Sequence, residues 1–448
     1  MSNVIKINKG LDIKLEGVAD KVLSNSARPQ TVAVKPTDFH GIIPKLVVRE
    51  GDEVKAGAPL FYSKDDPRIK FVSPVSGEVV EVVRGAKRKI LEVKILADQQ
   101  NTYAEAFTKQ GTREELVESL CESGLWAFIN QRPYDVVASP NDDPKAIVVS
   151  GFDSAPLSAD IDFVLHGRDA DFQAGLDVLA KLTSGKVHLN VHATRTTSDF
   201  IKNAKNVQVN VFDGPHPSGL VGVQINKINP INKGERVWTI EPQRVAMIGK
   251  YFKEGKYDAS VVVALAGSMV EKPRYYKTII GANIKSIVDG NIKTGDEPRF
   301  ISGNVLTGEQ VDVDGYLGSL TNTITVIPEG REPQPLGWIA PNFDKLSKSR
   351  TFFSWLMPGK RYNLNTSMNG EHRALVVTGQ YEEVFPIDVL PQYLIKSIVT
   401  NDIEKMENLG IYEVAPEDFA LCEFVCTSKQ DLQQIVREGL DMAKSELG

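Results

Sequence analysis

Two glycine-containing stretches near the N-terminus carry the strongest indication of architecture: EGDEVKAGAPL at residues 50–60 and SPVSGEV at residues 73–79. Gly51 and Gly57 mark turns, and short apolar runs flank them. Comparable runs, separated by Gly, Pro and Asp, recur throughout the first hundred residues. Short runs at this spacing predict an all-β barrel or sandwich over residues 1–100.

The same two stretches resemble the halves of a biotinyl or lipoyl carrier domain. In carriers of that type a modified lysine stands at the tip of a short hairpin between the halves. Here the connecting segment, residues 63–70, contains Lys64 and Lys70, but it is longer than a hairpin tip and contains Pro67. We therefore expect a barrel-sandwich domain of the carrier type that is not modified.

The hydrophobic period changes at about Thr112. Thr112, Glu114 and Glu115 form a typical helix start, with a capping side chain and acids in the first turn, and Gly124 ends that helix. Runs typical of strands and of helices then alternate at residues 146–150, 169–182, 186–191, 198–203 and 207–212. Alternation of this kind predicts an α/β domain with a parallel sheet over residues 101–255.

The rest of the chain divides into three parts. Strand patterns predict a small α+β domain over residues 256–330, after a helical pattern at residues 242–254. Prolines and glycines then indicate a linker and docking segment over residues 331–390. Apolar residues at helical spacing predict a C-terminal helical domain over residues 391–448.

Part of the linker combines aromatic and basic residues. In a helix, Leu346, Phe353, Leu356 and Met357 would share one face, with cations between and after them. Such a face suits docking to a membrane partner, and it suits packing on its own domain equally well. The sequence leaves both interpretations open.

The composition argues against a nucleic-acid-binding protein and against a membrane-spanning one. The chain has 448 residues, with 52 basic and 58 acidic side chains and a formal net charge of −6. A polyanion-binding chain carries a basic excess, so we expect no nucleic-acid partner. No apolar run approaches the ~18–20 residues that span a bilayer, and the N-terminus lacks the apolar core of a signal peptide. We expect a cytoplasmic protein that reaches a membrane through a partner.

The cysteines and histidines do not predict a metal centre. A cluster held by four thiolates needs four cysteines, and this chain has only Cys121, Cys422 and Cys426. Cys422 and Cys426 lie one helical turn apart, and we interpret them as buried thiols. His188 and His192 fall in a strand pattern, which puts them about 13 Å apart at ~3.3 Å per residue, too far for one metal ion.

Two loops of the α/β domain bear on ligand binding. The turn at Gly151 lacks the further glycines of a dinucleotide-binding loop, and Phe152 adds bulk, so an independent nucleotide site is not expected. The loop GPHPSGLVG follows the strand at residues 207–212, at the sheet edge that ligands favour. Gly214, His216 and Gly219 are therefore candidates for a ligand-edge loop, and packing against a neighbour is the alternative.

Taken in order, several stretches resemble those of the A-subunit family of sodium-translocating NADH:quinone reductases. The stretches that carry the resemblance are IKINKGLD at residues 5–12, SPVSG at 73–77, RGAKR at 84–88, GPHP at 214–217, ISGNVLTG at 301–308, FPIDVLP at 385–391 and DFALCEFVC at 418–426. The resemblance extends over essentially the whole chain.

The resemblance implies a fold of four parts: a biotinyl-like barrel, a Rossmann-like domain, a β-grasp domain of the soluble-ligand-binding type and a helical C-terminal region. It also implies a six-subunit membrane complex that passes electrons from NADH through flavins and iron–sulfur centres to ubiquinone and exports sodium ions. This subunit would be peripheral, on the cytoplasmic face of the bacterial inner membrane. It would bind no redox cofactor and would be associated with quinone reduction and with membrane-embedded partners.

One aromatic segment is the predicted quinone contact. Aromatic, basic and amide side chains near a helix end can stack on a planar ring and meet its carbonyls, although aromatics at a domain junction are also common in cores. The expected contacts are Trp126, Phe128, Arg132 and Tyr134, with Phe39, His40 and Gly41 from the barrel. No catalytic residue and no metal ligand is predicted.

Three alternatives remain open. The first is a free-standing NAD(P)-dependent oxidoreductase, which the missing glycine fingerprint disfavours. The second is a carrier-domain protein with a lipoylated lysine. The third is an Rnf-like subunit, which needs cysteines that this chain lacks.

Overall fold

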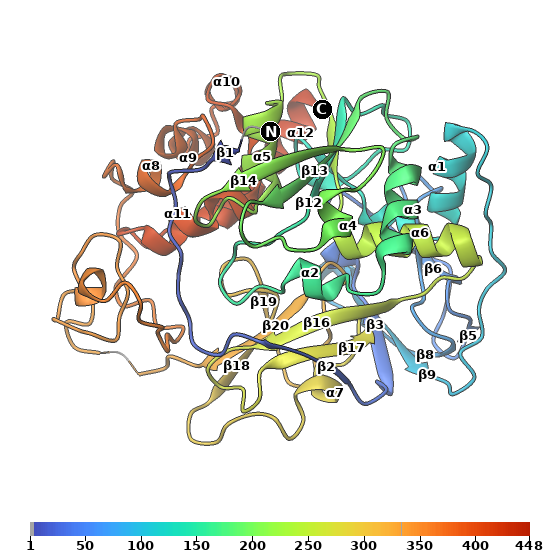
Figure 1. Ribbon diagram of the computed structural model, residues 1–448, viewed down its shortest axis with the longest axis horizontal. Coiled ribbons are helices and arrows are strands. Elements are labelled where there is room, and N and C mark those ends of the chain that lie inside the picture. The colour runs from blue at the N-terminus through green and yellow to red at the C-terminus, as the bar shows by residue number, and fades with distance from the viewer. Residues whose placement is uncertain (1–3, 333) are drawn as a thin grey trace.

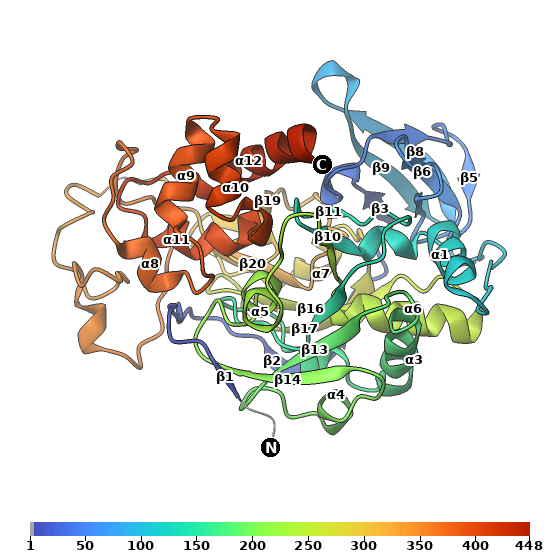
Figure 2. The same ribbon diagram turned by 90° about the horizontal axis from the view of Figure 1, so that it is seen from above.

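The computed structural model describes residues 4–332 and 334–448. Within these residues the strands form four sheets, of seven, six, four and three strands. The two large sheets lie one above the other in the middle of the molecule, the two small sheets lie at one side, and the C-terminal helices gather at the other (Figures 1 and 2). Among the helices described, none has the length and apolar character needed to cross a bilayer.

The two small sheets form the expected barrel-sandwich. Their strands are β3 (Thr31–Val34), β4 (Pro44–Leu46), β5 (Glu53–Val54), β6 (Pro59–Ser63), β7 (Lys70–Val72), β8 (Gly77–Arg84) and β9 (Ile90–Ala97). One sheet has the order β3-β9-β8-β5 and the other β4-β6-β7. Leu60, Phe61, Phe71 and Val79 are buried in its core, where the rings of Phe61 and Phe71 stack with centroids 4.6 Å apart.

The seven-stranded sheet confirms the prediction of a parallel α/β layer. Its strands are β1 (Ile5–Lys6), β10 (Asn130–Arg132), β11 (Val136–Val137), β12 (Ala146–Ser150), β13 (Lys186–His192), β14 (Gln208–Asp213) and β15 (Val237–Thr239). They have the order β1-β14-β13-β12-β15-β10-β11. The pairs from β1 to β15 are parallel, and β10 and β11 add an antiparallel edge.

Helices cover this sheet. They are α1 (Arg113–Glu122), α2 (Ile161–Val164), α3 (Asp169–Leu179), α4 (Asp199–Lys202), α5 (Val221–Ile228) and α6 (Pro242–Glu254). The predicted helix start is confirmed, because Thr112 and Glu115 form a reciprocal capping box at α1. Gly124, with φ of 75°, lies just beyond its end.

Helices α3 and α6 pack unusually closely through two glycines. A Cβ on Gly175 would lie 2.0 Å from the carbonyl oxygen of Val245, and a Cβ on Gly249 would lie 1.8 Å from that of Asp171. The obstacles are backbone atoms, which cannot rotate away. The two helices therefore approach each other only because both positions lack a side chain.

The six-stranded sheet lies below the parallel one in Figure 1. Its strands are β2 (Asp20–Asn25), β16 (Ser260–Ala266), β17 (Arg274–Ile279), β18 (Pro298–Ser302), β19 (Glu309–Val311) and β20 (Thr323–Pro328), with α7 (Lys285–Val288) beside them. The strand order is β19-β18-β20-β16-β17-β2.

The N-terminal residues differ from the sequence prediction, which put them in the barrel. Strand β1 pairs with β14 of the seven-stranded sheet, and β2 pairs with β17 of the six-stranded sheet. Each strand covers a sheet edge that would otherwise be unpaired. Residues 5–25 therefore tie the two large sheets together before the chain enters the barrel. The predicted boundaries further along the chain stay predictions.

The helical face predicted for residues 343–362 is wrong. Only a single 3-10 helix, Phe353–Leu356, forms there. Ser347 Oγ accepts a hydrogen bond from the backbone N–H of Phe352 at 2.9 Å, and Ser349 Oγ lies 2.8 Å from Thr351 Oγ1. These local hydroxyl contacts stabilise a loop in place of helical turns.

The C-terminal part of the chain is helical, as the sequence indicates, and its bounds as a domain stay a prediction. It contains α9 (Pro391–Val399), α10 (Ile403–Asn408), α11 (Ala420–Val425) and α12 (Leu432–Leu447), and α8 (Gln380–Val384) precedes it. Leu394, Phe419 and Leu440 share one hydrophobic cluster with Ile7 and Phe152. The helical domain is therefore packed onto the α/β layer and the N-terminal segment.

We predict that Gly249→Ala lowers the free energy of unfolding by ~1–3 kcal/mol, because the added methyl group forces α3 and α6 apart. Urea denaturation measures this loss. The matched control is Gly359→Ala, since no atom lies within 4 Å of a Cβ at that position. We expect the control to stay within ~0.5 kcal/mol of the unsubstituted protein. Equal stability of the two variants would contradict the packing argument.

Candidate functional site

The aromatic segment predicted to contact a quinone lies in the core. Trp126, Phe128, Arg132 and Tyr134 are all buried. The indole Nε1 of Trp126 donates to the backbone carbonyl of Ala138 at 2.8 Å, so its polar atom is already satisfied. A ring that contacts Trp126 would therefore have to displace packed side chains.

Two of the predicted residues meet at a small cavity. Phe39 and Phe128, with ring centroids 6.2 Å apart, line a space of about 20 Å³ together with Phe71 and Tyr257. A space of this size holds about one water molecule. His40 and Gly41 follow Phe39 and are exposed. The structure thus brings Phe39 and Phe128 together, and the quinone contact stays a prediction.

Arg132 has a different role, as the centre of a buried ion network. Its guanidinium is 1% exposed and donates to Asp418 Oδ2 at 2.8 Å and to Glu417 Oε1 at 2.5 Å. Asp418 is buried, whereas the Glu417 side chain is 35% exposed. Burial alone would lower the pKa of Arg132, but the carboxylates of Asp418 and Glu417 raise it overall, so the side chain stays charged.

Asp418 lies against the N-terminal turn of helix α5. A Cβ on Gly222, the second residue of α5, would lie 2.4 Å from Asp418 Oδ1. The N-terminus of a helix carries partial positive charge and unpaired N–H groups, and in α/β proteins it is a common place for a phosphate. Here the carboxylate of Asp418 lies beside that turn, and its Oδ1 accepts no hydrogen bond from the helix.

The loop at residues 214–222 is covered by the N-terminal segment. The N–H of His216 donates to Asp12 Oδ1 at 2.9 Å, and the His216 carbonyl accepts from the N–H of Leu11 at 2.8 Å. The Nδ1 of His216 lies 3.0 Å from Ser154 Oγ, which also accepts from the N–H of Gly219 at 2.8 Å. Gly214, His216 and Gly219 therefore belong to a packed loop.

Burial sets the protonation state of His216. The side chain is 2% exposed, and burial lowers its pKa to about 4, although Asp12 opposes this shift. The imidazole is therefore neutral at pH 7 in the folded protein.

The turn at Gly151 is also occupied by groups of the chain itself. The N–H of Gly151 donates to the carbonyl of Asn190 at 2.7 Å, and the ring of Phe152 packs against His192 with centroids 5.1 Å apart. Phe152 is buried. A bulky side chain thus lies where a dinucleotide-binding loop presents glycine.

The strand predicted at His188 and His192 and the buried thiols predicted at Cys422 and Cys426 are observed. His188 and His192 lie in strand β13. Cys422 and Cys426 are buried free thiols, burial raises the pKa of Cys422, and Cys426 Sγ lies 2.8 Å from Tyr381 Oη. Across residues 4–332 and 334–448 no group of three or more His, Cys, Asp or Glu side chains could hold a metal ion.

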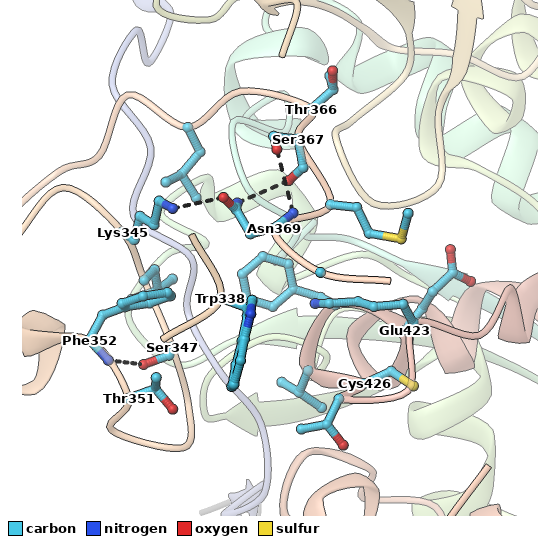
Figure 3. A pocket seen from close by; sticks show the side chains of 18 of the residues that line it. Trp338, Lys345, Ser347, Thr351, Phe352, Thr366, Ser367, Asn369, Glu423 and Cys426 are labelled. Atoms are coloured by element: carbon cyan, nitrogen blue, oxygen red, sulfur yellow. Dashed lines mark hydrogen bonds between the residues drawn. The ribbon is translucent and has the colours of Figure 1, made fainter. Parts of the chain in front are cut away.

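A pocket of about 880 Å³ lies between the linker and the C-terminal helical domain (Figure 3). Its lining includes Trp338, Lys345 and Asn369 from the linker, and Glu423 and Cys426 from the α11 region. Both walls contain stretches that the sequence singled out, one around Leu346 and the other at residues 418–426. The sequence did not predict the pocket, because these stretches lie more than fifty residues apart and no local pattern brings them together.

Hydrogen bonds of Lys345 connect the parts of the linker that form one wall of the pocket. Lys345 Nζ donates to the carbonyl of Gly337 and to Asn369 Oδ1, both at 2.8 Å, and burial lowers the pKa of Lys345. Trp338 is 46% exposed, and the guanidinium of Arg373 lies 5.3 Å from its ring centroid. The pocket therefore offers an aromatic face beside cationic and amide donors.

Comparison with known proteins places this geometry in a family. Family models match the chain as the NqrA N-terminal barrel-sandwich hybrid domain at residues 5–98, the NqrA second alpha/beta domain at residues 111–257 and the NQRA C-terminal domain at residues 262–313. The A subunit of the Na(+)-translocating NADH-quinone reductase from Photorhabdus laumondii is 38% identical, over 99% of this chain and 100% of that protein. The chain belongs to this A-subunit family.

Two further members of the family match the chain over the same length. The corresponding proteins of Vibrio parahaemolyticus and Neisseria meningitidis serogroup C are 37% and 36% identical, each over 99% of this chain and 100% of the relative. The resemblance inferred from the sequence is confirmed, and the chain is a subunit of an oxidoreductase complex. Among solved structures, an NAD+-reducing [NiFe]-hydrogenase is 12% identical with a TM-score of 0.37, covering 74% of this chain and 61% of that one, and this likeness supports no inference.

We predict that lowering the pH from 7 to 5 removes ~2 kcal/mol of stability through His216. A histidine with a depressed folded-state pKa contributes its full stability above the unfolded value near 6.5 and loses it as the pH falls toward the folded value near 4, because only the unfolded chain takes up the proton.

The measurement is urea unfolding of the unsubstituted protein and of His216→Gln at pH 7 and pH 5. Other groups titrate equally in both proteins, so the difference between their pH dependences isolates His216. A variant whose stability falls with pH as steeply as that of the unsubstituted protein would refute the prediction.

Proposed function

We propose that this chain is the peripheral subunit of a membrane complex that oxidises NADH, reduces ubiquinone and exports sodium ions. In this role it binds no redox cofactor itself and takes part in quinone reduction. The relatives are named as subunits of a Na(+)-translocating NADH-quinone reductase, which supports NADH, quinone and sodium as the substrates of the assembly. Flavins and iron–sulfur centres would belong to other subunits, including membrane-embedded ones at the cytoplasmic face of the inner membrane.

One observation carries the proposal that the chain is not itself a nucleotide enzyme. The carboxylate of Asp418 lies at the N-terminal turn of α5, where a phosphate would bind. A phosphate there would meet a buried negative charge. We infer that the layer is a Rossmann-like domain whose nucleotide edge is filled by the chain, and that the six-stranded sheet is a β-grasp domain.

The same observation weighs against a free-standing NAD(P)-dependent oxidoreductase. The lipoyl-carrier alternative is disfavoured in part by Lys70, whose ammonium group pairs with Glu122. Lys64 is exposed. A lipoyl or biotinyl adduct on Lys64 in an intact-mass measurement would support the carrier alternative.

Two places are candidates for the quinone headgroup. The aromatic segment around Trp126 and Phe128 has the stacking surfaces, but the nearby cavity has a volume of about 20 Å³. The pocket at Trp338 has a volume of about 880 Å³, within the usual range for ligand sites. There the Trp338 ring can stack on a quinone, and Asn369 can donate to a carbonyl. We favour the pocket because the ring fits it without displacing core side chains.

We predict that Trp338→Ala in the assembled complex raises the KM for ubiquinone about tenfold, since one stacking partner is worth up to ~1.5 kcal/mol. NADH oxidation with a water-soluble electron acceptor should stay unchanged. The matched control is Tyr393→Ala, an aromatic residue 51% exposed on α9 and absent from the pocket lining.

Conservative variants of the other candidate complete the test. If Trp126→Phe and Phe128→Leu raise the KM while Trp338→Ala does not, the aromatic segment is the quinone contact. If none of the three changes the KM, this subunit does not bind the quinone, and the proposed part in quinone reduction fails.

A further inference from the structure

Residues 334–377 form a protruding lobe, which we call the aromatic lobe. It projects from the side of the molecule opposite α1 and α6, as the orange part of the ribbon in Figure 1 shows. Much of it lacks helix and strand. Its large apolar side chains are exposed to an unusual degree, between 46% and 66%: Leu336, Trp338, Ile339, Phe343, Trp355 and Leu356. Clustered exposed apolar side chains on a folded protein indicate an interaction site.

Specific contacts hold the exposed apolar side chains of the lobe in place. The ring of Phe343, 55% exposed, packs on Phe353 with centroids 4.8 Å apart. Phe353 begins the 3-10 helix that also presents Trp355 and Leu356, which are 53% and 56% exposed. Lys360 Nζ donates to the carbonyl of Phe343 at 3.0 Å, and this hydrogen bond holds two parts of the loop together. Phe343, Trp355 and Leu356 are therefore three exposed apolar side chains on a loop that local contacts hold in place.

The lobe differs in charge from the rest of the chain. Residues 334–377 contain six Lys or Arg and two Asp or Glu, a net charge of +4, whereas the whole chain has a net charge of −6. The remaining residues therefore carry −10. An anionic surface would attract the lobe and repel the rest of the molecule, which fixes the orientation of approach.

The tryptophans also distinguish the lobe from the rest of the chain, because they are exposed in the lobe and buried elsewhere. Trp126 and Trp238 are completely buried, and the other two of the four tryptophans, Trp338 and Trp355, are exposed in the lobe. The guanidinium of Arg350 lies 5.7 Å from the ring centroid of Trp355. Tryptophan beside arginine is typical of side chains that settle at the boundary between lipid headgroups and acyl chains.

We propose that the aromatic lobe binds the surface of a lipid bilayer that contains anionic lipids, with Phe343, Trp355 and Leu356 inserted among the headgroups. A lipid surface fits better than a folded protein partner, because the apolar tips stand on an irregular loop with cations between them and offer neither an open strand edge nor a continuous helix face. Insertion removes the tips from water, and the guanidinium of Arg350 beside Trp355 meets lipid phosphates.

This inference deepens the proposed peripheral role and rests on it for its biological setting. Binding of the lobe to a bilayer would also place the pocket near the membrane surface. Trp338 belongs to both the lobe and the pocket lining, so a lobe seated on the bilayer brings the pocket close to the phase in which a lipid-soluble quinone is dissolved. The test uses lipid vesicles and the full chain alone, so that its failure and the failure of the quinone proposal are distinguishable.

The experiment measures co-sedimentation of the full chain with vesicles of phosphatidylcholine, with and without about one third phosphatidylglycerol, at low and high salt. Binding to the anionic vesicles at low salt is expected, with a blue shift of tryptophan fluorescence. Because Trp126 and Trp238 are already buried, that shift reports on the lobe.

The test variant is Trp355→Ala with Leu356→Ala, and the matched control is Leu23→Ala with Val47→Ala, two side chains 51% and 50% exposed outside the lobe. We expect the test variant to lower the partition coefficient by about tenfold or more and the control to leave it unchanged. All four positions are exposed, and circular dichroism verifies that both variants fold.

Three results would overturn the proposal. The first is no binding of the unsubstituted chain to anionic vesicles at low salt. The second is binding that the Trp355→Ala, Leu356→Ala variant retains in full. The third is binding only to vesicles that carry a reconstituted membrane protein, which would make the lobe a protein contact.

Discussion

A buried arginine pairs the α/β layer with the C-terminal domain. Arg132 lies at the edge of the seven-stranded sheet, and its partners Asp418 and Glu417 come from the C-terminal domain nearly three hundred residues away. Taking a guanidinium and a carboxylate out of water costs several kcal/mol per ion, which only close pairing offsets. Neither charge can therefore be buried without the other. The C-terminal domain docks on the α/β layer where these two charges pair.

That constraint determines which surfaces remain open. With the C-terminal domain docked, Asp418 lies at the N-terminal turn of α5, and the N-terminal segment covers the loop around His216 through Asp12. The sheet edge where α/β proteins commonly bind ligands is thus filled by the chain itself. A volume of about 880 Å³ remains open in the pocket at Trp338.

The sequence predicted those parts of the fold whose signal is local. Turn glycines marked the barrel, and Thr112 marked the start of a helix. Strand β2 escaped detection because most of its residues are exposed and show no apolar alternation. The helix expected around Phe353 was wrong because periodicity does not register hydroxyl side chains that favour a loop. The ion network, the burial of Trp126 and the pocket depend on pairing between distant segments, about which local patterns carry no information.

The most direct test of this account is a double-mutant cycle on the free energy of unfolding of the full chain, with Arg132→Met, Asp418→Leu and the double variant. We expect each single change to cost ~3–5 kcal/mol, because it leaves a buried charge unpaired, and the double variant to cost far less than the sum of the two. A coupling energy of at least ~2 kcal/mol is expected. Strictly additive losses would contradict the claim that this pair fixes the C-terminal domain on the sheet.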